Sequence, residues 1–143
     1  MTASSLSDRI EEVTADGWRI VRERGVDMIL SAYYMSYNHQ LFDKCLPEMD
    51  IFWASSIASP DGRHANALYI SEESPVKRRY IVLDENLNSM FPLERLCLLH
   101  EMVHVRLEPI SGHGDEFIAE FKRVLDANRW EVLGCIDEPM PRE

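Results

Sequence analysis

One segment, residues 92–107, constrains the fold of this chain more than any other. Apart from three charged residues in its flanks, its side chains are apolar nearly all round, and its polar centre is confined to residues 100–104. This pattern predicts a helix buried between two layers of the molecule. Pro92 suits the first helical turn, where its missing N–H breaks no hydrogen bond, and Pro109 stops the helix. The polar centre of a buried helix needs a chemical explanation.

The polar centre reads His-Glu-Met-Val-His and places His100 and His104 four residues apart. Four residues along an α-helix advance about 6 Å and return to nearly the same face, so both imidazoles can bind one metal ion. Glu101 points to a neighbouring direction, from which it can act as general base on a zinc-bound water without ligating the ion. The alternative is a structural helix whose histidines have hydrogen-bond partners. Because such residues are costly to bury unless paired or coordinated, we predict a Zn²⁺ site.

The third ligand decides the class of zinc site, because structural zinc takes four protein ligands whereas catalytic zinc takes three and keeps one position open. His113 is the best candidate, nine residues after His104. The glycines on either side of it permit a tight chain reversal and a close approach to the metal. Zinc also accepts oxygen ligands, so three carboxylates remain as alternatives: Glu108, Asp115 and Glu116.

Hydrophobic periodicity predicts three further helices. Residues 5–24 have apolar side chains at helical spacing after a capping pattern of Ser5 and Asp8, so the first 25 residues are expected to form an added N-terminal helix. A second helix is expected over about residues 26–44, with its tyrosines in the core rather than on a ligand face. The last helix should begin near residues 111–117.

Three short runs rich in aromatic and β-branched residues predict strands: residues 51–53, 67–70 and 80–83. The segments between them carry turn-forming residues, so hairpin-like loops should join the strands into a small, mainly antiparallel sheet. At 143 residues the chain suits a single domain spanning residues 1–143. The predicted fold class is α+β, with a three-stranded sheet packed against the helix of residues 92–107 and its flanking helices.

Composition restricts the partners of this chain. A formal net charge of −10 opposes binding to DNA and anionic lipid, and residues 77–79 are the one local basic cluster, Lys-Arg-Arg. The N-terminus lacks a signal-peptide pattern and no apolar run is long enough to span a bilayer, so we expect a cytoplasmic protein without membrane contact. Three cysteines without paired spacing are expected to be reduced, mostly buried thiols: Cys45, Cys97 and Cys135.

The segment LLHEMVHVRL and the following SGHGDEFIAEFKRVL resemble the core of the SprT-like (Spartan-like) zinc metallopeptidases, in which an HExxH helix precedes a GHG-type turn and a downstream Phe. Upstream segments, around Tyr37-Asn38 and residues 51–53 and 80–83, are also similar, so the resemblance covers about residues 30–127. It implies a minimal zincin fold with Glu101 as the base. The implied zinc ligands are His100, His104 and His113.

The resemblance also bears on function. DNA-linked members of the family carry a C-terminal cysteine zinc ribbon or other DNA-binding parts, whereas this chain has only Cys135 in that region, so direct DNA binding is not expected. The predicted activity is zinc-dependent hydrolysis of a protein or peptide that pairs along an exposed strand edge. The oxyanion could be stabilised by one of four residues: Arg63, Tyr69, Tyr80 or Arg106. The alternatives are a zinc-stabilised protein-binding or regulatory module without activity, and a DNA-associated protease whose partner supplies the DNA contacts.

Overall fold

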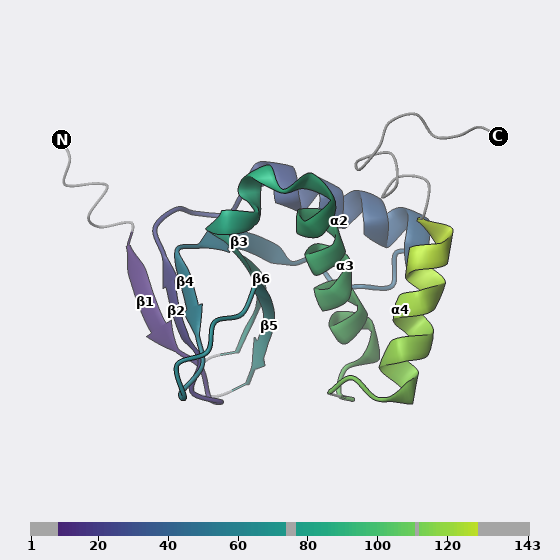
Figure 1. Cartoon of the computed structure of the whole chain (residues 1–143). Coiled ribbons are helices and arrows are strands. Elements are labelled where there is room, and N and C mark those ends of the chain that lie inside the picture. Colours follow the sequence, from purple (N-terminus) through teal and green to yellow (C-terminus); the bar gives the residue numbers. More distant parts are fainter. Residues whose placement is uncertain (1–8, 74–76, 111, 129–143) are drawn as a thin grey trace.

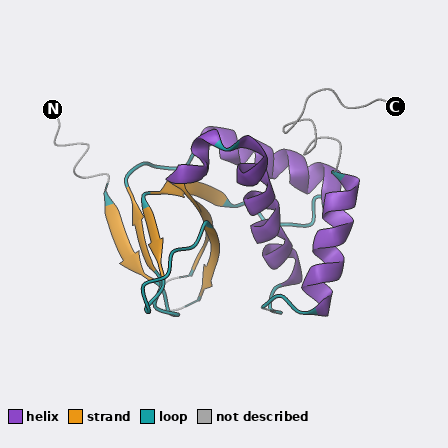
Figure 2. Cartoon of the chain, viewed as in Figure 1, coloured by secondary structure: helices purple, strands orange, loops and turns teal. Residues whose placement is uncertain are grey.

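The computed structural model describes residues 9–73, 77–110 and 112–128, which adopt an α+β fold (Figure 1). Among these residues are three α-helices and one short 3-10 helix: α2 (Met28–Leu41), η1 (Glu85–Ser89), α3 (Phe91–Leu107) and α4 (Asp115–Ala127). The strands form two three-stranded sheets: β1 (Ile10–Val13), β2 (Arg19–Arg22), β3 (Asp50–Ala54), β4 (Ser56–Ala58), β5 (Ala67–Glu72) and β6 (Arg78–Asp84). The helices gather on one side of the β3-β6-β5 sheet, and the β1-β2-β4 sheet lies on its other side (Figure 2).

The three predicted strands are confirmed as β3, β5 and β6, but the mainly antiparallel arrangement is wrong. The sheet has the order β3-β6-β5 and is mixed, because β3 runs parallel to β6 while β5 runs antiparallel to it. Parallel neighbours need a crossover connection of a dozen or more residues. The chain between β3 and β6 is long enough for this, since it first visits the other sheet as β4 and then returns as β5. The expectation of a hairpin therefore failed between β3 and β5, whereas the consecutive strands β5 and β6 form the expected antiparallel pair.

The predicted N-terminal helix is also wrong where the structure describes it, because β1 and β2 form an antiparallel hairpin that pairs Ile10 with Arg22. Gly17 in the turn has φ +88, and a Cβ there would lie 2.6 Å from Cγ of Pro60, so both conformation and space require glycine. Fully buried Ile20 pairs with β4, and this long-range contact outweighs the local helical periodicity. The capping pattern of residues 5–8 lies outside the described residues.

Two hydrophobic clusters fill the spaces between the layers. The smaller one lies between the two sheets and has six buried members: Ile20, Ala54, Ile57, Ile70, Tyr80 and Val82. The larger one lies between the β3-β6-β5 sheet and the helices, and includes Tyr34 and Tyr37 of α2, which confirms the core assignment of these tyrosines. Consecutive residues of a strand face opposite layers, so each strand of the mixed sheet contributes to both clusters.

The three helices predicted after residue 25 are confirmed, with small shifts at their ends. Asp27 caps α2 by accepting a 2.9 Å hydrogen bond from the backbone N–H of Leu30. Pro92 lies in the first turn of α3, and that helix ends at Leu107 as expected. Helix α4 begins at Asp115 directly after the glycine-flanked His113. No helix of the described residues is long and apolar enough to cross a membrane.

Candidate metal centre

The structure brings together the three histidines that the sequence singled out. His100 and His104 lie on α3, and His113 lies in the loop that connects α3 to α4. The Nε2 atom of His113 lies 3.1 Å from Nε2 of His100 and 3.2 Å from Nε2 of His104. One ligand atom from each residue lies within 4.8 Å of the other two, so this histidine cluster (His100, His104 and His113) is able to hold a metal ion.

The donor geometry of the histidine cluster is compatible with a tetrahedral metal ion. Tetrahedral zinc with Zn–N bonds of about 2.0–2.1 Å separates its nitrogen ligands by about 3.3–3.4 Å. The two separations at His113 Nε2, 3.1 and 3.2 Å, are close to that value. A ring nitrogen has one in-plane position, occupied either by a proton or by a lone pair, so this atom cannot make two good hydrogen bonds at once. A shared cation satisfies all three lone pairs.

Burial keeps two of the rings in the form that binds metals. It lowers the pKa of His100, with the neighbouring His113 adding to the effect. It lowers the pKa of His104 to about 4, with further contributions from His100 and His113. Both imidazoles are therefore neutral near pH 7, and a neutral imidazole is the species that donates a lone pair to a metal.

Phe117 supports all three histidines. Its ring centroid lies 4.8 Å from that of His100, 4.6 Å from His104 and 4.7 Å from His113, and the side chain is buried. Being in the first turns of α4, Phe117 couples the orientation of the rings to the packing of α4 on α3. Sequence reasoning placed Phe117 on an apolar helix face and missed this contact. The sequence contained one signal for this contact, which is that Phe117 follows His113 by four residues.

Glu101 lies beside the histidine cluster but is not part of it. Its Oε2 is 4.0 Å from Nε2 of His100, and the residue is 6% exposed. Burial raises the pKa of this carboxyl to about 8, against the effect of a hydrogen bond from the Tyr69 backbone. A carboxyl group in this position can accept or return a proton beside the histidines.

The three carboxylates considered as alternative ligands do not join the histidine cluster. Glu108 faces β5, where it accepts hydrogen bonds from the hydroxyl groups of Tyr69 at 2.8 Å and Ser71 at 2.5 Å, and from Arg79 at 3.0 Å. Asp115 and Glu116 lie exposed in the first turn of α4. Sequence reasoning could not predict that Glu108 already has three hydrogen-bond donors, because these donors lie on β5 and β6, far from Glu108 in the sequence.

Of the four residues considered for the oxyanion, Tyr69 alone lines the cavity beside the histidines. Arg63 forms an ion pair with Asp61 in an exposed turn. Tyr80 is buried in the cluster between the two sheets. Arg106 is half-exposed and lies 4.0 Å from Glu120 of α4.

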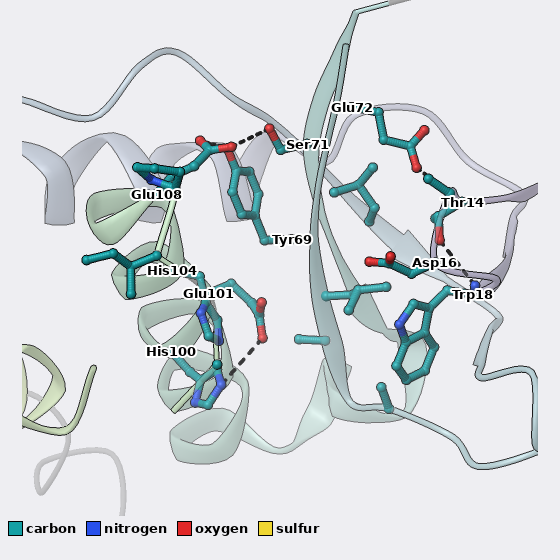
Figure 3. Close-up of a pocket in the computed structure, with 18 of the residues that line it drawn as sticks. Thr14, Asp16, Trp18, Tyr69, Ser71, Glu72, His100, Glu101, His104 and Glu108 are labelled. Carbon is teal, nitrogen blue, oxygen red and sulfur yellow. Dashed lines mark hydrogen bonds and ion pairs between the residues drawn. The ribbon is translucent and has the colours of Figure 1, made fainter. Parts of the chain in front are cut away.

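A cavity of about 590 Å³ runs between α3 and β5 and continues to the turn between β1 and β2 (Figure 3). His100, Glu101 and His104 form the wall on the α3 side. β5 crosses the middle, and it is an edge strand of the mixed sheet. Thr14, Asp16 and Trp18 are seen on the opposite side of β5 from the histidines. Sequence reasoning missed this second wall, because it predicted a helix over these residues.

The two cysteines in the described part of the chain are free thiols, as expected. Cys97 of α3 is half-buried, and burial raises the pKa of its thiol to about 11. Cys45 is exposed. Cys135 lies outside the described residues.

No family model, curated protein or solved structure that was compared with this chain gave a match. Inference about its function therefore depends on the site itself. That site is a group of three histidines able to hold a metal ion, next to a buried glutamate and on the wall of a cavity.

Proposed function

We propose that this protein is a zinc-dependent metallopeptidase of the SprT-like, minimal zincin type. His100, His104 and His113 are its zinc ligands and Glu101 is its general base. The observation that carries the proposal is the convergence of three Nε2 atoms on one wall of a cavity, with a buried carboxyl group beside them. Three histidines leave a tetrahedral ion with one open position, which is typical of catalytic rather than structural zinc.

Zinc bound by three histidines supplies Lewis acidity, which makes a water molecule more acidic and polarises a substrate carbonyl. A cation held by the histidines would favour the ionised form of Glu101 against the effect of burial, and in that form Glu101 accepts the proton of the attacking water and later donates it to the leaving amine. Phe117 holds the three imidazoles in their orientation through its ring contacts. Tyr69 is the cavity residue suited to stabilising the oxyanion, provided that its single hydroxyl proton moves from Glu108, to which it donates in the structure, to the substrate oxygen.

The free edge of β5 supports a peptide substrate. Among the strands of the described residues, β5 pairs only with β6, and its residues line the same cavity as the histidines. An extended peptide can add to such an edge, where main-chain hydrogen bonds position the scissile bond. Nucleic acid is less well suited, because in the basic cluster Arg78 pairs with Glu12 and Glu72, and Arg79 pairs with Glu108.

The test combines metal content with activity on denatured casein. The purified protein should contain one zinc ion per chain by elemental analysis. Glu101→Gln should keep the zinc and lose about 10²–10⁴-fold in rate, and His104→Ala should lose both zinc and activity. His39→Ala is the matched control, since His39 is exposed on α2 and away from the cavity.

Two outcomes would contradict the proposal. A protein purified without zinc and unable to bind it would refute the metal centre. Stoichiometric zinc without hydrolysis of any substrate in a broad panel would refute the peptidase and would favour the alternative of a zinc-stabilised binding module.

A further inference from the structure

We infer that the turn between β1 and β2 forms a substrate subsite, in which Asp16 and Trp18 bind a lysine or arginine side chain of the extended polypeptide. The inference rests on the proposed peptidase function and adds a substrate class to it. It concerns the wall of the cavity that lies across β5 from the histidines (Figure 3).

The two faces of β5 meet different layers. Ala67 and Tyr69 pack against the large core on the side of α3, whereas Leu68 and Ile70 pack against the cluster between the sheets. A polypeptide added to the edge of β5 continues the pleat, so its successive side chains also point to alternate faces. Every second side chain is then directed to the histidine wall, and the others to the turn between β1 and β2.

The turn is held in place by several contacts. The backbone N–H of Gly17 donates to the carbonyl of Thr14 at 2.9 Å, and the hydroxyl of Thr14 accepts from the backbone N–H of Trp18 at 3.1 Å. The backbone N–H of Ala15 donates to Glu72 at 2.5 Å, which ties the turn directly to β5. The wall is therefore positioned before any substrate arrives.

The side chains of this wall suit a cation. Trp18 is half-buried against the cluster between the sheets and lines the cavity, and Asp16, two residues earlier in the same turn, also lines it and is seen on the same side of β5 (Figure 3). The methylene stem of a lysine or arginine can pack on an indole ring, whose face attracts the charged end. The carboxylate of Asp16 then faces that charged end across the turn.

The charges along the cavity favour the same ligand. The described residues that line it include four acidic ones, Asp16, Glu72, Glu101 and Glu108, and no lysine or arginine. Glu72 and Glu108 are engaged by arginines from outside the cavity. Asp16, by contrast, is exposed and forms no ion pair with any described residue. It is thus the carboxylate that is available to a basic substrate.

The test measures binding separately from hydrolysis. Zinc-loaded Glu101→Gln protein is titrated into fluorescein-labelled ten-residue peptides of Thr and Ser with one central Lys, Gln or Glu, and binding is followed by fluorescence anisotropy. The Lys peptide should bind about threefold to tenfold more tightly than the Gln peptide, and the Glu peptide most weakly. Adding Asp16→Asn should remove most of this preference, and adding Asp16→Lys should reverse it.

A matched control separates local from global charge. Asp126→Asn changes the net charge by the same amount as Asp16→Asn, but on α4 and outside the cavity. It should leave the preference for the Lys peptide intact. A preference that survives Asp16→Lys, or the absence of any preference or of any binding, would overturn the subsite. Hydrolysis of casein by the wild-type protein together with such a result would leave the peptidase standing. Binding that depends on Lys and on Asp16, in a protein that hydrolyses nothing, would support the subsite and refute the peptidase.

Discussion

Two clusters of ionisable residues lie on opposite faces of β5, and they are built differently. On the side of the small sheet, Arg78 places one nitrogen 2.6 Å from Glu12 and another 2.5 Å from Glu72. On the side of α3, the histidine cluster brings three basic nitrogens together, and the contact between Nε2 of His100 and Oε2 of Glu101 is a long one at 4.0 Å. In the first cluster Arg78 has an acidic partner for each of two nitrogens, whereas the second presents three converging lone pairs.

This difference indicates that the charges of the Arg78 cluster stabilise the fold, whereas the histidine cluster is suited to binding a metal ion. Opposite charges within hydrogen-bond distance need no further partner, and their effect is on stability. Lone pairs that face one another lack a complement within the protein, so a bound cation completes them. Changes in the first cluster should therefore alter stability without altering metal affinity, and changes in the second should do the reverse.

The largest effect is expected for His113→Ala. The change removes one of three ligands from an exposed loop position, so zinc affinity should fall by more than about 100-fold while the metal-free protein keeps its stability. Competition with a chromophoric chelator measures the affinity, and urea unfolding of metal-free protein measures the stability. His64→Ala, outside the cluster, is the control. Unchanged zinc affinity in His113→Ala would contradict the assignment of the histidine cluster to metal binding.

Arg78→Met should lower the free energy of unfolding by about 2 kcal/mol at pH 7, because it leaves Glu72 without its guanidinium partner and Glu12 with only the longer contact to Arg22 at 3.8 Å. Zinc affinity should not change. The backbone N–H of Ala15 and then Arg78 hold the pKa of Glu72 below its ordinary value of 4.5. A carboxylate with a lowered folded pKa stabilises above that value, and the contribution is lost as the pH falls.

The stability deficit of Arg78→Met should therefore shrink below about pH 4.5. Urea unfolding of the wild-type protein and of Arg78→Met, at several values between about pH 3.5 and about pH 7, measures this deficit. A deficit that is constant with pH would show that Arg78 acts through packing rather than through charge.

Phe117→Leu should weaken zinc binding by about tenfold, since the ring that contacts all three histidines is lost while an apolar side chain remains. Phe121→Leu is a graded control, because Phe121 contacts His100 at 5.5 Å and should matter less. The same chelator competition measures both variants. Equal effects of the two substitutions would contradict the positioning role of Phe117.

The smallest effect is expected for Arg79→Gln, which removes an ion pair from the α3 side of β5. Arg79 and Glu108 have side chains 34% and 31% exposed, and Glu108 keeps hydrogen bonds from Tyr69 and Ser71. The free energy of unfolding should fall by less than about 1 kcal/mol. Thermal and urea unfolding would detect a larger loss, which would mean that this pair is as important as the Arg78 cluster.

The helices and the histidine cluster were predictable because their signals are local. Because His100 and His104 are four residues apart on a single helix, they lie on nearly the same face of it. Pro92 indicates where that helix begins. The position of His113 between two glycines indicated a turn that could return to α3. The structure confirms this return, since Nε2 of His113 lies 3.1 Å from Nε2 of His100 and 3.2 Å from Nε2 of His104.

The N-terminal hairpin was missed because a local signal competed with a distant one. Apolar spacing over residues 5–24 favoured a helix, while the Asp16-Gly17 pair, a common hairpin signal, favoured a turn. The pairing of Ile20 with Ile57 decided between them. Thirty-seven residues separate these partners in the sequence, so no local window contains both.

By itself, the sequence determined the buried helix, its two histidines and the adjacent glutamate, because an α-helix converts spacing directly into geometry. Only the tertiary structure decided the direction of β3, the free edge of β5 and the wall of Asp16 and Trp18 across from the histidines. These features depend on which strands pair and in what register. Pairing of that kind is settled by burial between layers far apart in the chain.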